Sequence, residues 1–302
     1  MQVDKIKGII VPIVTPMNDD ESINYEELKN HIDRLIDAGA HGIFPCGTNG
    51  EAYILSNEEK IELFKKTVEY VGKRVPVYAG TGCIGTKDTI ELSKKAEEIG
   101  VDVLSIVTPS FAKASQYELY THYCEIDKEV NIPILLYNIP ARTGNALEPE
   151  TVKKIAQNTK NIIGAKDSSG NWDNLKAYIQ VSKELDKEFR ILSGNDSLIL
   201  DALIEGGKGA IAGCANVYPK TLVSIYECFV EGKLEKARQA QDSIGEFRGV
   251  FKYGNPNTIT KLGTKLLGHK VGDCRRPFNY LSQEGMEELK RVLKKNQENG
   301  ME

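Results

Sequence analysis

Short apolar runs recur along this chain, and each is followed by a segment with the periodicity of an α-helix. The eight runs, rich in β-branched residues, are residues 8–14, 41–46, 75–79, 101–107, 132–137, 161–165, 189–192 and 208–214. The helical patterns that alternate with them are residues 25–36, 58–71, 89–99, 119–129, 152–157, 175–185, 198–204 and 222–231. Strands that are apolar throughout are typical of a parallel sheet buried by helices. Eight βα units within about 230 residues favour a (β/α)8 TIM barrel over a doubly wound sheet.

Beyond residue 231 the alternation stops, and three further helical patterns follow at residues 234–248, 257–267 and 282–295. No glycine- or proline-rich linker separates them from the barrel pattern. We therefore expect a catalytic barrel over residues 1–231 and a C-terminal helical region over residues 232–302. That region would pack on the barrel or on another subunit.

The composition argues against several classes of protein. The 302 residues carry a formal net charge of −4 and no dense block of Lys or Arg, which argues against nucleic-acid binding. No stretch of about 18 apolar residues is present to cross a membrane, and the N-terminal apolar run is too short for a signal peptide. The six cysteines lack a CxxC pair and the four histidines lack ligand spacing. We therefore expect reduced thiols in the cytoplasm and no metal site.

The predicted strands end in loops rich in Gly, Thr, Ser and Asn. In a (β/α)8 barrel these loops carry the chemistry, so they predict a site for a small, polar, oxygen-rich ligand. One of them, residues 80–85, matches the GxGxxG pattern of nucleotide-binding proteins. Other strand ends are equally rich in glycine and no acidic residue closes a following strand, which favours a simple barrel turn.

Lys166 directly follows the apolar stretch from Ile162 to Ala165, where the chain turns into a polar loop. A lysine in this place leaves the core at the carboxyl end of the sheet, where burial disfavours the charged form of an amine. A neutral amine can attack a carbonyl carbon and form a Schiff base. A surface lysine that merely opens a loop is the alternative interpretation.

Three other residues are candidates for chemistry at the same end. The loop of residues 47–51 can present successive backbone N–H groups to a carboxylate, with the Thr48 hydroxyl as a proton relay; a plain turn capped by Thr48 is the alternative. Tyr137 ends a strand and can act as acid and base, or else packs with its hydroxyl satisfied. Arg142 can hold a carboxylate in a bidentate pair, or else forms a salt bridge on the barrel rim.

Together these motifs resemble a known family over essentially the whole chain. The motifs are GTNGE at residues 47–51, YNIPARTG at 137–144, GAKDS at 164–168, SGND at 193–196 and GGKGAIAGCANV at 206–217. The chain resembles the dihydrodipicolinate synthase / N-acetylneuraminate lyase family of pyruvate-dependent class I aldolases. The resemblance implies a (β/α)8 barrel with a C-terminal helical region, a homotetramer built as a dimer of dimers, and no metal or organic cofactor.

The resemblance also implies roles for individual residues. Lys166 would form the imine with pyruvate, Thr48 would bind its carboxylate and relay protons, and Tyr137 would be the acid and base. Arg142 would bind the carboxylate of the second substrate, as in the synthases. The other residues expected to bind substrate are Gly47, Asn49, Phe111, Gly194 and Ile211.

The chain departs from the synthases of this family at several positions. Asn49 stands where synthases usually have a second threonine, and Phe111 stands where they place a tyrosine that is contributed across the dimer interface. The lysine feedback site looks absent, because the residues at its place are Ala52, Tyr53, Asn57, Lys60, Ile84 and Ser110.

The activity that follows is condensation of pyruvate with an aldehyde, as in 4-hydroxy-tetrahydrodipicolinate synthases, or cleavage of a 2-oxo acid to pyruvate. Arg142 favours the synthases. Phe111 leaves open an aldolase for a 2-keto-3-deoxy sugar acid, N-acetylneuraminate or 4-hydroxy-2-oxoglutarate. A barrel that binds a 2-oxo acid without turnover is a further alternative.

Overall fold

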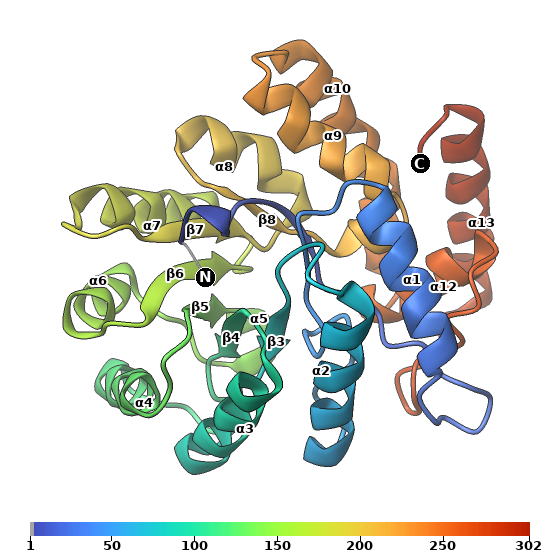
Figure 1. Ribbon diagram of the computed structural model, residues 1–302. Coiled ribbons are helices and arrows are strands. Elements are labelled where there is room, and N and C mark those ends of the chain that lie inside the picture. Colours follow the sequence, from blue (N-terminus) through green and yellow to red (C-terminus); the bar gives the residue numbers. More distant parts are fainter. Residues whose placement is uncertain (1–2) are drawn as a thin grey trace. The chain divides into compact units, whose positions relative to one another are not determined.

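The computed structural model describes residues 3–302, and in that range it contains one sheet of eight strands. The strands are β1 (Gly8–Val11), β2 (Gly42–Ile43), β3 (Tyr78–Gly80), β4 (Val103–Val107), β5 (Ile134–Asn138), β6 (Ile162–Asp167), β7 (Arg190–Ser193) and β8 (Gly209–Ile211). β1 pairs with β2, and β3 to β8 pair in succession, always in parallel. The predicted (β/α)8 barrel is confirmed (Figure 1).

Two compact units make up the chain. The first unit contains the residues up to Gly8 together with Pro76–Ile211, and the second contains Ile9–Val75 together with Ala212–Glu302. The C-terminal helices therefore share a unit with the first two βα repeats. The boundary that the sequence suggests at residue 231 stays a prediction.

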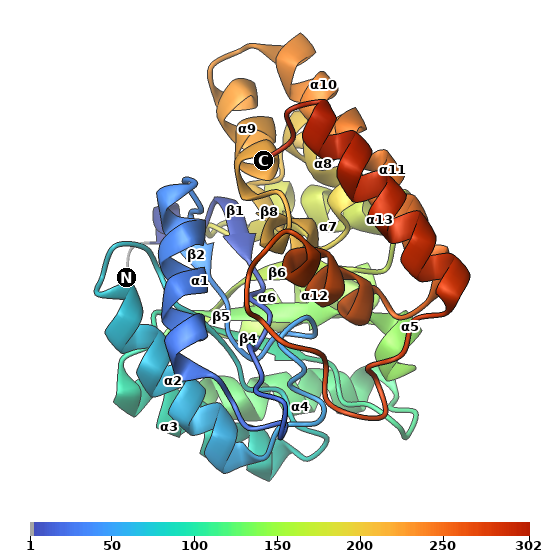
Figure 2. The same cartoon turned by 90° about the vertical axis from the view of Figure 1, so that its right-hand side faces the viewer.

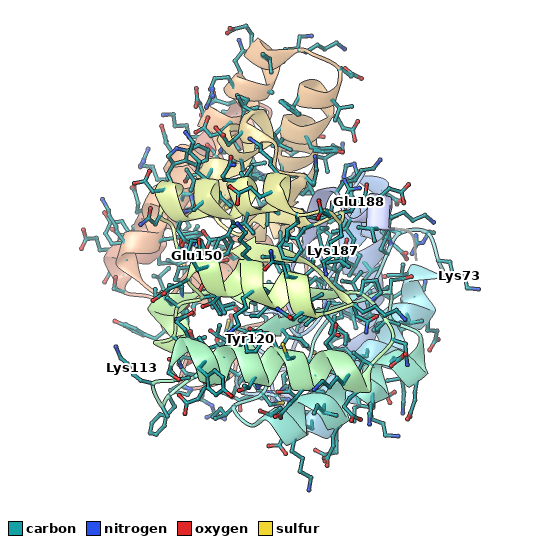
Figure 3. The ribbon with its side chains drawn as sticks, turned by 90° about the vertical axis from the view of Figure 1, so that its left-hand side faces the viewer. Lys73, Lys113, Tyr120, Glu150, Lys187 and Glu188 are labelled. Carbon is teal, nitrogen blue, oxygen red and sulfur yellow. The ribbon has the colours of Figure 1, made fainter. Side chains whose placement is uncertain are left out.

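In the first unit the strands β3 to β8 alternate with helices that cover their outer side (Figure 1). These helices are α3 (Thr86–Ile99), α4 (Gln116–Glu129), α6 (Pro149–Asn158), α7 (Trp172–Glu184) and α8 (Ile199–Glu205), and a short helix, α5 (Pro140–Thr143), follows β5. Close strand contact requires glycine at position 164, where a Cβ atom would lie 2.3 Å from the carbonyl oxygen of Arg190. Figure 3 shows this layer of helices from outside. Lys113, which follows β4, labels one end of the helices, and Lys187, which precedes β7, labels the other end.

The second unit holds β1 from Ile9 onward, β2 and the remaining helices. They are α1 (Tyr25–Asp37), α2 (Asn57–Val71), α9 (Pro219–Val230), α10 (Leu234–Ser243), α11 (Gly245–Gly249), α12 (Pro256–Leu266) and α13 (Gln283–Glu298). α9 and α10 pack side by side, and the C-terminus lies next to α9, where the backbone N–H of Thr221 donates to the carbonyl of Glu302 at 2.7 Å (Figure 2). A capping box between Ser56 and Glu59 fixes the start of α2.

Several predicted elements differ from the structure, and some of the differences have identifiable reasons. β1 and β2 are shorter than predicted because Pro12 and Pro45 follow them closely, and proline cannot donate to a strand ladder. The single helix predicted at residues 234–248 is divided into α10 and α11 near Gly245. The short helix α5 was missed, although Pro140 at its start and left-handed Gly144 at its end are helix signals.

Within residues 3–302 no helix combines the length and apolar character needed to cross a bilayer. The same residues contain no group of three or more His, Cys, Asp or Glu side chains arranged to hold a metal ion.

Candidate active site

Lys166 and Tyr137 lie face to face in the first unit. They are register partners in the parallel pairing of β5 with β6, one residue before each strand ends. The Lys166 Nζ lies 3.8 Å from the centroid of the Tyr137 ring. Both side chains are only 4% exposed. The sequence predicts Lys166 at the end of its strand, and it lies within β6, so the strand itself fixes the direction of the amine.

Gly194, directly after β7, lies against the stem of Lys166. A Cβ atom at this position would lie 3.0 Å from the Lys166 Cε and 1.9 Å from the Ser168 Oγ. The Gly194 N–H donates to the carbonyl of Asp167 at 2.7 Å, and its carbonyl accepts from the Ser168 hydroxyl at 3.2 Å. Only glycine leaves room for the lysine here. Ile211, the last residue of β8, is fully buried.

The next register pair, Asn138 and Asp167, fixes the two strand ends that carry the lysine and the tyrosine. The Asn138 Nδ2 donates to the Asp167 Oδ1 at 2.8 Å, and the Ser169 hydroxyl donates to the Oδ2 at 2.8 Å. The Asn138 Oδ1 accepts from the Leu147 N–H at 3.0 Å. Sequence reasoning did not assign Asn138 or Asp167. Each directly follows Tyr137 or Lys166 at the end of a predicted strand, and this position could have identified them from the sequence.

Arg142 and Phe111 come from the loops of the first unit. Arg142 is exposed on the short helix α5. Phe111 lies between β4 and α4, has a left-handed φ of 77°, and is 98% exposed. Both are therefore surface residues of this unit.

Gly47, Thr48 and Asn49 belong to the second unit, in the turn between β2 and α2. The Asn257 Nδ2, on α12, donates to the Thr48 carbonyl at 2.7 Å. A Cβ atom at Gly213 would lie 2.9 Å from the Asn49 Nδ2, so Asn49 lies close to the backbone that follows β8. Two N–H groups of this turn, those of Glu51 and Ala52, donate back to the carbonyls of Thr48 and Gly47.

A buried ion pair holds the end of this turn. The Lys261 Nζ on α12 donates to the Glu51 Oε1 at 2.7 Å, and both side chains are almost completely buried. The other oxygen of Glu51 accepts from the backbone N–H of Arg275 at 2.9 Å. Burial and the nearby Glu51 charge raise the pKa of the Cys274 thiol to about 12, so it stays protonated. The sequence singled out Glu51 only as part of a motif, and Lys261 was missed.

The comparisons with known proteins agree along almost the whole chain. Residues 5–296 match the model of the dihydrodipicolinate synthetase family. A 4-hydroxy-tetrahydrodipicolinate synthase of Methanopyrus kandleri is 38% identical over 293 residues, which cover 96% of each chain.

Two solved structures are also similar. The dihydrodipicolinate synthase of Aquifex aeolicus has a TM-score of 0.92 and 32% identity, covering 97% of this chain and 98% of that one. YagE, a family member from E. coli K12 solved in complex with pyruvate, has a TM-score of 0.92 and 29% identity, covering 97% of this chain and 99% of that one. This chain therefore belongs to the dihydrodipicolinate synthetase family of pyruvate-dependent Schiff-base lyases.

Proposed function

We propose that this lyase acts as a 4-hydroxy-tetrahydrodipicolinate synthase or a close paralogue, and that Lys166 forms its Schiff base with pyruvate. One observation carries the proposal: the buried Lys166 Nζ lies 3.8 Å from the centre of the Tyr137 ring. A buried amine is a nucleophile, and a phenol next to it can donate or accept a proton. Both groups can therefore act on the same carbonyl.

The proposed chemistry starts with attack of the Lys166 amine on the keto carbon of pyruvate. A C–N bond forms, and the carbonyl oxygen leaves as water after it is protonated, with Tyr137 as the proton donor. The resulting imine withdraws electrons, so the methyl carbon can lose a proton to give an enamine. That carbon then attacks the carbonyl carbon of the second substrate, and water releases the product from Lys166.

The remaining assignments rest on the family resemblance. Thr48, Gly47 and Asn49 bind the carboxylate of pyruvate, and Thr48 relays protons. Gly194 and Ile211 line the site through their backbone. Arg142 binds the carboxylate of the second substrate, since a guanidinium can hold a carboxylate with two hydrogen bonds.

Phe111 favours a second candidate function. Phenylalanine cannot pass a proton, so the relay of a threonine and two tyrosines found in the synthases would be broken at this position. An aldolase for a 2-keto-3-deoxy sugar acid, N-acetylneuraminate or 4-hydroxy-2-oxoglutarate does not depend on that relay. Asn49 also departs from the two threonines usual in synthases.

The assembly and location are proposed on the same resemblance. We expect a cytoplasmic homotetramer, built as a dimer of dimers, that is insensitive to lysine. The almost complete exposure of the Phe111 ring supports an assembly in which a second copy covers it.

Treatment with pyruvate and borohydride tests the imine. The reduced adduct should form on Lys166 and be absent from Lys166→Ala, whose fold circular dichroism should show to be intact. Lys187 is the matched control: its Nζ donates to the carbonyls of Thr159 and Ile162 near the start of the same strand (Figure 3), so Lys187→Met should still form the adduct. A missing adduct would refute the mechanism and favour a barrel that only binds a 2-oxo acid, whereas an adduct on another lysine would refute the role of Lys166.

Turnover separates the two candidate functions. A synthase should prefer aspartate semialdehyde over keto-deoxy sugar acids by several orders of magnitude, and Phe111→Tyr should raise its rate. The opposite preference would establish the aldolase.

A further inference from the structure

Asn145 is a buried asparagine two residues after α5, and its side chain binds a single segment of chain. The Nδ2 donates to the carbonyls of Pro109 and Ala112, each at 2.8 Å. The Oδ1 accepts from the backbone N–H of Ala114 at 2.8 Å. One side chain therefore satisfies three backbone groups of the loop between β4 and α4, which we call the Phe111 loop (residues 109–114).

The Phe111 loop needs such support. Phe111 adopts a left-handed φ of 77°, which disfavours a residue with a Cβ atom. Its ring is 98% exposed, so packing within the first unit does not offset that strain. Lys113, on the same loop, also extends outward at the edge of the helical layer (Figure 3).

The backbone of Asn145 connects this loop to α5. Its carbonyl accepts from the Thr143 hydroxyl at 3.0 Å and from the Thr108 hydroxyl at 3.1 Å. Thr143 is the last residue of α5 and follows Arg142 directly. Thr108 immediately precedes the Phe111 loop, and its N–H donates to the carbonyl of Tyr137 at 3.1 Å. Asn145 thus joins the segments that carry Phe111, Arg142 and Tyr137.

We propose that Asn145 is a positioning residue that sets the placement of Arg142 and Phe111 for the second substrate. The inference rests on the proposed function. Asn145 does not touch reacting atoms; it acts through the two segments that it holds together. Because the β5–β6 pairing that places Lys166 against Tyr137 does not involve the Asn145 side chain, imine formation with pyruvate does not depend on it.

Asn161 offers a matched control in the same unit. Its Nδ2 also donates to two carbonyls, those of Asp127 at 3.0 Å and Val130 at 2.8 Å, but it lies before β6, at the end of the strands away from Lys166. Removing either asparagine leaves two backbone carbonyls without their donor, so both variants should lower the melting temperature.

Steady-state kinetics and adduct formation on the full-length protein separate the roles. Asn145→Ala should raise KM for the second substrate about tenfold or more, which corresponds to one lost strong contact. The rate at which the borohydride-trapped pyruvate adduct forms on Lys166 should stay within about twofold of the rate in the parent enzyme. Asn161→Ala should change neither value. Equal effects of the two variants, or an unchanged KM in Asn145→Ala, would overturn the proposal.

Hydrogen exchange tests the same inference without a known second substrate. In Asn145→Ala the amide of Ala114 and those of residues 141–143 should exchange faster together, while Asn161→Ala leaves them unchanged. Unchanged exchange at Ala114 would refute the positioning role. A missing pyruvate adduct in the parent protein would instead refute the Schiff-base function, so the two failures are distinguishable.

Discussion

Each unit contains a loop in which a non-glycine residue adopts a left-handed backbone conformation. These residues are Phe111 after β4, with a φ of 77°, and Glu51 after β2, with a φ of 61°. The Phe111 loop is held by neutral hydrogen bonds from Asn145, between 31 and 36 residues away in sequence. The turn that ends at Glu51 is held by the charge of Lys261, 210 residues away.

This difference between neutral and charged contacts predicts how each loop responds when its contacts are removed. Neutral hydrogen bonds contribute about 1 kcal/mol each, so the Phe111 loop should loosen while the unit stays folded. A buried charge that loses its partner destabilises the whole fold, because the remaining ion keeps its desolvation cost. The turn after β2 is thus coupled to global stability, whereas the loop after β4 can adapt to a different substrate at small cost.

The largest effect is expected for Lys261→Met, which leaves the buried Glu51 without its paired ammonium group. We expect a loss of about 3–5 kcal/mol in the free energy of unfolding, measured by urea titration. Lys265→Met, on the same helix α12, removes only an exposed pair with Asp273 and should cost less than about 1 kcal/mol.

The double variant Glu51→Gln/Lys261→Met sharpens this test. The amide oxygen of the introduced glutamine would keep an acceptor for the Arg275 N–H, and no uncompensated charge would remain. The double variant should therefore be more stable than Lys261→Met alone. If it is less stable, the ion pair does not explain how the turn is held.

The same contrast explains what could be predicted from the sequence. Lys166 and Tyr137 were predicted because each ends an apolar strand, and parallel register then brings neighbouring strand ends together. Lys261 was missed because a lysine in an amphipathic helix gives no sign that it is buried, and its partner is 210 residues away. Asn145 was missed because its three side-chain bonds depend on the path of a loop that has no periodicity.

A second prediction compares buried histidines in the two units. Burial, reinforced by the nearby Arg34 charge, lowers the pKa of His31 to about 3, and burial lowers the pKa of His122 to about 4. His31 belongs to the second unit, where its Nε2 pairs with the Asn216 Oδ1 at 3.1 Å; His122, in the first unit, pairs with Thr86. Both side chains are therefore neutral in the folded protein near neutral pH.

The sign of the pH effect follows from proton uptake. An unfolded histidine binds a proton below about pH 6.5 and the folded one does not, so acid favours unfolding. Each histidine should remove about 1.4 kcal/mol of stability per pH unit as pH falls from about 6.5 toward its folded pKa. His31→Gln should flatten the dependence of the unfolding free energy between about pH 6 and about pH 5, because this interval lies below the unfolded pKa and above the folded one. An unchanged slope would show that His31 is protonated in the fold.

A further prediction concerns Asn257→Ala, which removes the donor to the Thr48 carbonyl at 2.7 Å and a contact with the Tyr53 hydroxyl at 3.3 Å. We expect a loss of about 1–2 kcal/mol in unfolding free energy.

Asn296, whose Nδ2 donates to the Tyr218 hydroxyl at 3.0 Å, is an equally buried control in the same unit. If Thr48 binds the pyruvate carboxylate as proposed, Asn257→Ala should raise KM for pyruvate and Asn296→Ala should not. This is the reverse of the Asn145→Ala pattern, in which only the second substrate is affected. A single pattern shared by Asn257→Ala and Asn145→Ala would mean that the two loops do not divide the substrates between them.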